Sequence, residues 1–231
     1  MKLIKRVLII FVIILLVVTG FQVKGGYDRY KSALEEKPLE TVIDELKSEE
    51  DYTKYEDIPK IYFEALVAVE DRRFYKHNGF DFIGSCRAVY NDIKAWELLE
   101  GGSTIAQQLA KNLYFPNDHT LERKIAEIFM ALKIEREYEK EDVLEFYVNG
   151  IYYGSGYYNI YDASMGYFGK APSEMNDYEC TLLVGIPNAP SVYSLNNRPD
   201  LARQRQKKVI DCMVEVEYIT EDEGKEILGE E

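Results

Sequence analysis

The 231-residue sequence has few of the residues that build disulfide frameworks, metal centres and nucleic-acid surfaces. Three cysteines and two histidines are too few, and too widely spaced, for a disulfide framework or a zinc site. Basic residues are also scarce, with 28 Lys and Arg against 41 Asp and Glu, giving a formal net charge of −13. This balance excludes general nucleic-acid binding, which needs a basic face against the phosphates. An anionic substrate would therefore need a local cluster of cations.

Apolar and aromatic residues, by contrast, are plentiful. The chain is 46% hydrophobic and contains 10 Phe and 19 Tyr, which is enough for a packed core and excludes a wholly disordered protein. Its length suits one domain with appendages. Few stretches alternate as strands do, so we expect a mainly α fold. The expected helices cover about residues 59–70, 82–99, 104–115, 121–137 and 142–149, with two more starting near 200 and 220. Thr104 and Gln107 have capping-box spacing at the start of the third, and the fourth would bury a stripe of Ile125, Ile128, Phe129 and Leu132.

The longest apolar run lies at the N-terminus, over residues 7–23, after Lys2, Lys5 and Arg6. A helix of this length spans about 25 Å, the short end of a bilayer crossing. A cleaved signal peptide is the alternative, but no Ala-x-Ala pattern follows the run. We expect a cytoplasmic tail (1–6), an uncleaved transmembrane signal anchor (7–23), a charged stem (24–56) and an exported domain (57–231).

The helix expected from Thr104 would have an unusual polar face. Its core side would carry Ala106, Leu109, Ala110 and Leu113, and its other side Thr104, Gln107, Gln108 and Lys111, with Asn112 at the edge. The ordinary interpretation is a solvated amphipathic helix. However, exposed faces usually carry Glu and Lys, whereas amides, a hydroxyl and one cation hydrogen-bond a sugar or a phosphate.

Arg123 and Glu127 are four residues apart and therefore neighbours on one helical face, with Lys124 beside them. A surface ion pair of small energetic value is the ordinary interpretation. The functional one is a phosphate-binding cation next to a carboxylate that binds a metal or positions a leaving group. Spacing alone favours the ordinary interpretation.

Glu70 ends an expected helix whose last turn is apolar, so its carboxylate leans toward the core side. A carboxylate placed in this way is a candidate general base. A helix-end acid paired with Arg72 or Arg73 is an equally good interpretation of the residues alone. His77 fits a hydrogen-bonded structural group better than a proton shuttle.

Several of these segments occur in a fixed order. They are residues 70–81 (Glu-Asp-Arg-Arg-Phe to Asp81), 101–112 (Gly-Gly-Ser-Thr-Ile-Ala-Gln-Gln-Leu-Ala-Lys-Asn), 123–127 (Arg-Lys-Ile-Ala-Glu), Lys140-x-x-Val143 with Tyr147-Val148-Asn149, and Arg205-x-x-x-Val209-Ile210. Together they resemble the motifs of glycosyltransferase family 51, the peptidoglycan glycosyltransferases. The resemblance covers about residues 58–213.

This resemblance implies a lysozyme-like helical lobe plus a small membrane-associated jaw, to which the segment after Phe82 would contribute. It also implies an activity: polymerisation of lipid II into the β-1,4 glycan strands of peptidoglycan. The growing undecaprenyl-diphosphate-linked strand would be transferred, with inversion, to the 4-hydroxyl of the acceptor. The catalytic domain would lie on the outer face of a bacterial cytoplasmic membrane, held by a single span.

Carried over residue by residue, the resemblance assigns the general base to Glu70 and the diphosphate to Lys111, Arg123 and Lys124. Glu127 would assist at the diphosphate, as a candidate ligand of Mg²⁺ or Mn²⁺. Other substrate-binding residues that shape the site would be Asp71, Phe74, His77, Thr104, Gln108 and Asn112. The implied partners are lipid II, lipid-linked glycan, the membrane and other cell-wall synthesis proteins, with no nucleic acid.

Two other classes of function stay open at this stage. A lysozyme-type enzyme that cleaves glycan would also use carboxylates, but it has no need of a phosphate cradle. An inactive, membrane-tethered scaffold for cell-wall synthesis is the other. Because the sequence contains neither Ser-x-x-Lys nor Lys-Thr-Gly, we expect a monofunctional enzyme that penicillin does not label.

Overall fold

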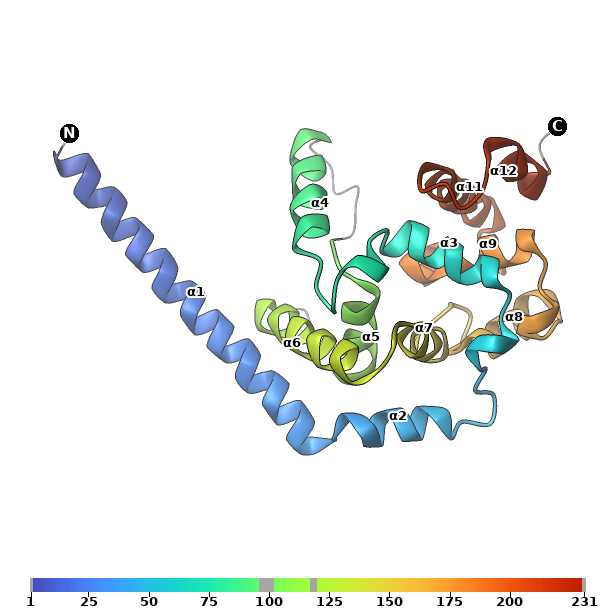
Figure 1. Ribbon diagram of the computed structural model, residues 1–231, viewed down its shortest axis with the longest axis horizontal. Coiled ribbons are helices and arrows are strands. Elements are labelled where there is room, and N and C mark those ends of the chain that lie inside the picture. Colours follow the sequence, from blue (N-terminus) through green and yellow to red (C-terminus); the bar gives the residue numbers. More distant parts are fainter. Residues whose placement is uncertain (1, 96–101, 117–119, 230–231) are drawn as a thin grey trace.

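The computed structural model describes residues 2–95, 102–116 and 120–229, and in this part the chain is built from helices (Figure 1). Within these ranges the β structure amounts to an isolated bridge between Asn78 and Phe80. The expected mainly α class is therefore confirmed. The α-helices are α1 (Lys2–Glu36), α2 (Leu39–Lys47), α3 (Lys60–Glu70), α4 (Phe82–Ala95), α5 (Ile105–Tyr114), α6 (Leu121–Glu137), α7 (Lys140–Asn149), α8 (Ile160–Phe168), α9 (Asp177–Gly185), α10 (Pro190–Tyr193), α11 (Pro199–Glu215) and α12 (Glu221–Leu228). Short 3₁₀ turns are η1 (Tyr55–Asp57), η2 (Phe74–Lys76), η3 (Pro172–Glu174) and η4 (Ile186–Asn188).

Two groups of helices pack around one core. Helix α3 packs against α9 and α11, while α5 packs against α6 and α7 (Figure 1). Apolar residues at helical spacing bury these faces: Leu66 and Ala68 on α3, Leu109 and Ala110 on α5. The core face predicted for the helix after Thr104 is thus correct. The C-terminal end of α3 lies beside the N-terminal part of α5. Glu70, the last residue of α3, contacts Gln108 of α5 there.

The buried side of α6 differs from the expected one. The sequence predicted a stripe of Ile125, Ile128, Phe129 and Leu132, yet the fully buried residues are Ala126, Glu127, Met130, Ala131 and Ile134. The reason is that α6 has two packed sides. One side faces α5 and the core, and Ile125 and Phe129 of the other side contact α1.

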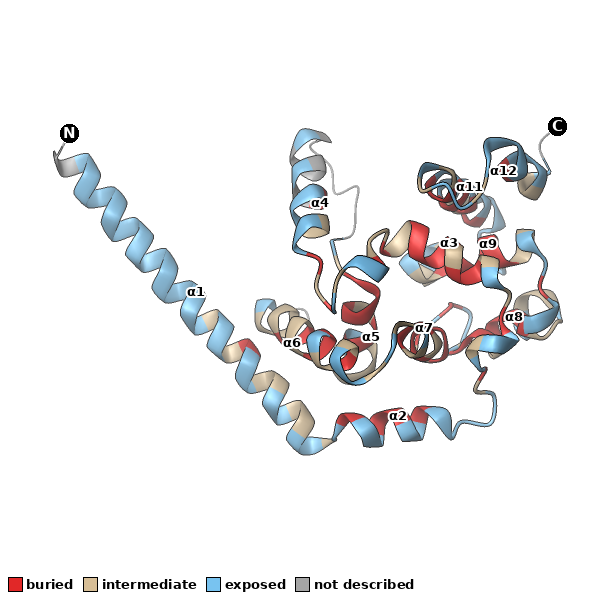
Figure 2. Ribbon diagram, in the orientation of Figure 1, coloured by how far each residue is buried: buried red, intermediate tan, exposed pale blue. Residues whose placement is uncertain are grey.

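Helix α1 continues well past the apolar run, which differs from the expected stem over residues 24–56. Its N-terminal part is exposed along its length, whereas the part after Val23 lies along α6 (Figure 2). Gly26 allows this close approach, since a Cβ there would lie 2.5 Å from Cβ of Ile125. The rings of Tyr27 and Phe129 then pack edge to face, 5.2 Å apart.

Helix α2 also belongs to the folded domain rather than to a stem. Leu39, Val42, Ile43 and Leu46 are buried on one side of it, facing the lobe (Figure 2). The sequence missed this because the segment is rich in charge overall, although its apolar residues recur at helical spacing.

Helix α4 stands apart from the main lobe (Figure 1). It carries exposed apolar side chains at Phe82, Ile83 and Tyr90. Residues 96–99, where the expected helix was to end, lie outside the described residues. The likeness to lysozyme and the role of α4 as a membrane jaw stay predictions.

Candidate active site

Glu70 is the last residue of α3, and both of its carboxylate oxygens accept hydrogen bonds. Nε2 of Gln108 donates to Oε2 at 2.9 Å, and Nη2 of Arg205 lies 3.2 Å from Oε1. The side chain of Glu70 is 13% exposed, so one edge of it reaches solvent. The pairing with Arg72 or Arg73 weighed above is wrong, since the cation comes from α11. These two contacts fix the plane of the carboxylate at the edge of the cavity.

Behind Gln108 lies a buried phenol that fixes the amide's orientation. The hydroxyl of Tyr147 on α7 donates to Oε1 of Gln108 at 3.1 Å. Burial, and next the charge of Glu70, raise the pKa of Tyr147 well above its ordinary value. The phenol therefore stays protonated and can only hold Gln108 with its Nε2 toward Glu70.

A cavity of about 460 Å³ opens beside Glu70. Its lining is unusually basic for a chain with a net charge of −13. The acidic residues are Glu70, Asp71 and Asp81, and the basic ones are Arg72, Arg73, Arg87, Arg205 and Lys208. The local cation cluster that an anionic substrate requires is therefore present next to Glu70.

The cavity wall is held in part by an ion pair between Nε of Arg73 and Oδ2 of Asp81, 2.9 Å apart. Burial alone would raise the pKa of Asp81, but the backbone hydrogen bond from Gly84 and the charge of Arg73 outweigh it and lower that pKa below its ordinary value. Asp81 is thus ionised at neutral pH, and it ties the loop after α3 to the first turn of α4.

The start of α5 is fixed by a capping box between Thr104 and Gln107, as their spacing predicted. The hydroxyl of Thr104 also donates to the carbonyl oxygen of Gly79 at 2.7 Å. Gly79 has a φ of +84°, and a Cβ there would lie 2.6 Å from the carbonyl oxygen of Ala131. Gln107 is 1% exposed and serves this cap rather than a polar surface.

On α6, Glu127 is completely buried and holds two cations. Oε1 pairs with Arg123, and Oε2 with Lys124 at 2.9 Å. Nζ of Lys124 also donates to Oγ of Ser103 at 2.6 Å. Because Ser103 lines the cavity, this contact links the α6 cluster to the cavity beside Glu70.

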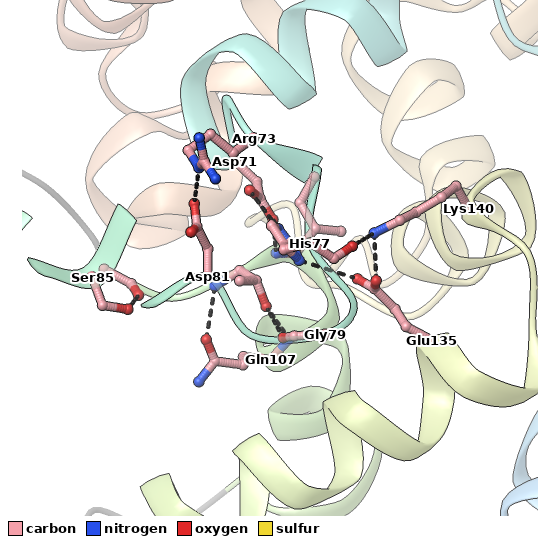
Figure 3. A network of polar contacts seen from close by, with 12 residues as sticks. Asp71, Arg73, His77, Gly79, Asp81, Ser85, Gln107, Glu135 and Lys140 are labelled. Carbon is pink, nitrogen blue, oxygen red and sulfur yellow. Dashed lines mark hydrogen bonds and ion pairs between the residues drawn. The ribbon is translucent and has the colours of Figure 1, made fainter. Parts of the chain in front are cut away.

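The other predicted site residues lie at different depths. Phe74, in the segment between α3 and α4, is fully buried. Nζ of Lys140 lies 4.2 Å from the centroid of its ring. His77 does not line the cavity, and its ring contacts Asp71, which does (Figure 3). Lys111 is exposed and Asn112 half-buried, further along α5. Glu70, Asp71 and Thr104 line the cavity.

Sequence reasoning gave no role to several residues of this site. Arg205 and Lys208 stand three apart on α11 and line the cavity together with Cys212, four residues further on. That i, i+3, i+7 spacing places them on one helical face. The spacing was the feature of the sequence from which a shared position at the site could have been predicted. Arg205 and Tyr147 were each quoted within a motif, but nothing in the sequence shows that they hold Glu70 and Gln108.

The residues present do not fit a metal held by the protein alone. Both oxygens of Glu127 already pair with cations. In the described parts of the chain, no group of three or more His, Cys, Asp and Glu side chains is arranged to hold a metal ion. Binding of Mg²⁺ or Mn²⁺ at Glu127 stays an untested prediction, and no step below depends on it.

The sequence is similar to that of known proteins over most of the chain. A family model described as transglycosylase matches residues 35–214. The monofunctional glycosyltransferase of Staphylococcus haemolyticus is 37% identical over 198 residues, which cover 81% of this chain and 73% of that protein. Penicillin-binding protein 1F of Bacillus subtilis is 44% identical over 168 residues, covering 73% of this chain. Penicillin-binding protein 1A of Aquifex aeolicus is 42% identical over 178 residues, covering 77% of it. The chain spans about a quarter (24%) of the length of each of these two penicillin-binding proteins.

Proposed function

Because the chain belongs to the transglycosylase family, we propose that it is a peptidoglycan glycosyltransferase that polymerises lipid II. The observation that carries the proposal is Glu70, an oriented carboxylate at the edge of a cavity lined by cations. A base beside a cation cluster suits a reaction in which a hydroxyl loses its proton while a diphosphate leaves.

In the proposed reaction the 4-hydroxyl oxygen of the acceptor lipid II attacks the anomeric carbon of the donor. The proton of that hydroxyl passes to Glu70, and the C–O bond to the undecaprenyl diphosphate breaks on the opposite face. The product is a β-1,4 bond formed with inversion. A carboxylate oxygen has two lone pairs, so Glu70 accepts this proton while Gln108 and Arg205 still hold it in place.

The leaving diphosphate gains charge as the bond breaks, and cations stabilise it. We assign this role to Lys111, Arg123 and Lys124, with the cations of the cavity holding the diphosphate of the acceptor. Glu127 acts through its partners in this scheme. Since it is fully buried and pairs with both Arg123 and Lys124, it fixes where their charges lie.

The membrane side of the proposal rests on α1 and α4. The part of α1 from Ile4 to Glu36 is long and apolar enough to cross a membrane by length and composition. We propose a single span with its basic end, Lys2 to Arg6, in the cytoplasm and the catalytic domain outside. The exposed Phe82, Ile83 and Tyr90 of α4 would then dip into the outer leaflet, where the lipid-linked substrates lie.

Incubation of the purified full chain with fluorescent lipid II tests the function directly. We expect products of high molecular weight on a gel that a muramidase degrades, formed at least a hundredfold more slowly by a Glu70→Gln variant. Shortening of preformed glycan strands would support a lysozyme-type enzyme instead. No change in either substrate, with the protein folded, would support an inactive scaffold.

A further inference from the structure

Glu135 is a buried carboxylate that the proposed reaction does not use. It lies on α6, about two turns beyond Glu127, and its side chain is 1% exposed. Oε2 forms an ion pair with Lys140, the first residue of α7. Oε1 has no hydrogen-bond partner among the described residues. A buried oxygen without a donor is costly and calls for a physical reason.

The neighbour of this oxygen is the ring of His77 (Figure 3). Nδ1 of His77 lies 4.0 Å from Oε1 of Glu135 and likewise has no partner in the described part of the chain. The other ring nitrogen, Nε2, lies 3.0 Å from both oxygens of Asp71. Nζ of Lys140 donates to the backbone oxygen of His77 at 2.8 Å. Asp71 thus holds the ring of His77, and Lys140 holds its backbone while pairing with Glu135.

The charges of this buried cluster balance only if one more proton is present. Asp71 and Glu135 supply two negative charges and Lys140 one positive charge, while Arg73 is paired separately with Asp81. A proton on Nδ1 of His77 makes the cluster neutral. It also gives Oε1 of Glu135 an oppositely charged neighbour at 4.0 Å, and an uncompensated buried charge is strongly destabilising.

The cluster controls a junction next to the proposed base. Asp71 follows Glu70 in the chain and accepts a hydrogen bond from the backbone N–H of Ile105, 3.2 Å away at the start of α5. Helix α5 carries Gln108, which donates to Glu70. Holding Asp71 in place therefore holds the end of α3 in register with α5.

We propose that Glu135 is a positioning residue: it forms an ion pair with the protonated ring of His77, keeps Nε2 of that ring on Asp71, and so aligns Glu70 with Gln108. The proposal rests on the proposed function, because it assigns Glu135 a part in the same site. Glu135 touches no substrate and acts only through His77 and Asp71.

Two substitutions distinguish a positioning role of Glu135 from a role in which its side chain only fills space in the core. In Glu135→Gln the amide oxygen still accepts from Lys140 and the amide N–H faces Nδ1 of an uncharged His77, so the cluster stays neutral and both neighbours are kept. Glu135→Leu keeps the size of the side chain but removes both contacts. We expect Glu135→Gln to keep kcat within a few-fold of the parent, and Glu135→Leu to lower kcat about a hundredfold with little change in KM for lipid II.

Glu137→Leu is the matched control, since Glu137 lies two residues away on α6, is more exposed and pairs with Lys133. It should leave kcat unchanged. Full activity of Glu135→Leu would overturn the proposal. So would a folded Glu135→Gln protein that is as slow as Glu135→Leu, because the retained neighbours should rescue it.

A spectroscopic test needs no substrate. The chain has two histidines, His77 and His119, so ¹⁵N-labelled histidine gives two ring systems, which a His119→Gln variant assigns. We expect Nδ1 of His77 to show a protonated or hydrogen-bonded nitrogen, and a bare nitrogen would overturn the proposal. If the parent failed to polymerise lipid II, the proposed function would fall while this signal still tested the pair. If Glu135→Leu failed to fold, the signal and the Gln variant would still decide.

Discussion

At the scale of single residues, the site depends on how one carboxylate is held. Glu70 has an amide partner on α5 and a guanidinium partner on α11, which are contributed by segments far apart in the sequence. Two directional contacts fix the plane of the carboxylate, and the buried Tyr147 fixes the amide in turn. The proposed base is therefore oriented before any substrate binds, which lowers the cost of reaching the transition state.

Arg205 should matter to the rate although its expected role is to orient Glu70. A hydrogen bond to a charged group contributes about 1.5–3 kcal/mol, so we expect Arg205→Lys to slow polymerisation roughly ten- to a hundredfold. Initial rates with fluorescent lipid II measure this. Arg203→Lys is the control, because Arg203 is exposed on the same helix. Equal rates for the parent and Arg205→Lys would show that the ion pair is dispensable.

Asp81 predicts a dependence of stability on pH. The pKa of Asp81 is lowered in the folded protein, so the ionised side chain stabilises the fold at pH values above the ordinary pKa of Asp, about 4. This stabilisation is lost as the pH falls through the lowered pKa. Asp81→Asn should therefore be less stable than the parent at neutral pH, with the difference shrinking at about pH 3. Denaturant unfolding of both proteins at the two pH values measures it. A difference that grew on acidification would contradict this assignment.

At the scale of elements, the helices were predictable but some of their partners were not. Periodicity and capping signals placed α3, α5, α6 and α11 close to their observed bounds. The buried stripe of α6 was wrong because the sequence does not reveal that α1 covers its second side. Glu127 was weighed as a surface residue because ionised side chains are rarely fully buried, yet it is completely buried.

The site residues divide in the same way: single residues of the motifs were predictable, but their contacts with one another were not. The resemblance brought Glu70, Lys111, Arg123 and Glu127 forward from ordered motifs. It did not bring forward Arg73 and Asp81, or Glu135 and His77, as pairs. Arg73 meets Asp81 through the path of the loop between α3 and α4, and Glu135 meets His77 where α6 passes that loop; short-range spacing determines neither arrangement.

The crossing of α1 and α6 can be tested through its glycine. A Cβ at Gly26 would overlap Ile125, so we expect Gly26→Leu to lower the free energy of unfolding by about 1–3 kcal/mol. Gly20→Leu is the control in the same helix, since nothing lies within 4 Å of that position. Thermal unfolding in detergent measures both. Unchanged stability of Gly26→Leu would mean that α1 does not pack on α6 in solution.

At the scale of the whole molecule, an acidic protein carries a basic cavity. The net charge of −13 does not oppose binding of a diphosphate inside that cavity, because the Debye length at physiological ionic strength is only about 8 Å. Local cations outweigh distant carboxylates at such range. Anchoring by α1 would further confine the protein to the surface that holds the lipid-linked substrates.

The anchor itself gives a prediction for the intact chain. The apolar run follows Lys2, Lys5 and Arg6 and lacks a cleavage pattern, so we expect the protein extracted from membranes to retain its N-terminus. N-terminal sequencing measures this directly. A mature protein beginning near Lys24 would show that the run is a cleaved signal peptide.

The most direct test of the central claim is the rate of lipid II polymerisation by Glu70→Gln. Glutamine keeps the size and hydrogen-bonding reach of the side chain but cannot act as the base, and loss of a positioned base costs about 10² to 10⁴ in rate. We expect a loss in that range, with near-normal affinity for a substrate analogue because the cations are untouched. Glu127→Gln should be slowed less. Polymerisation by Glu70→Gln within a few-fold of the parent would contradict the proposed mechanism.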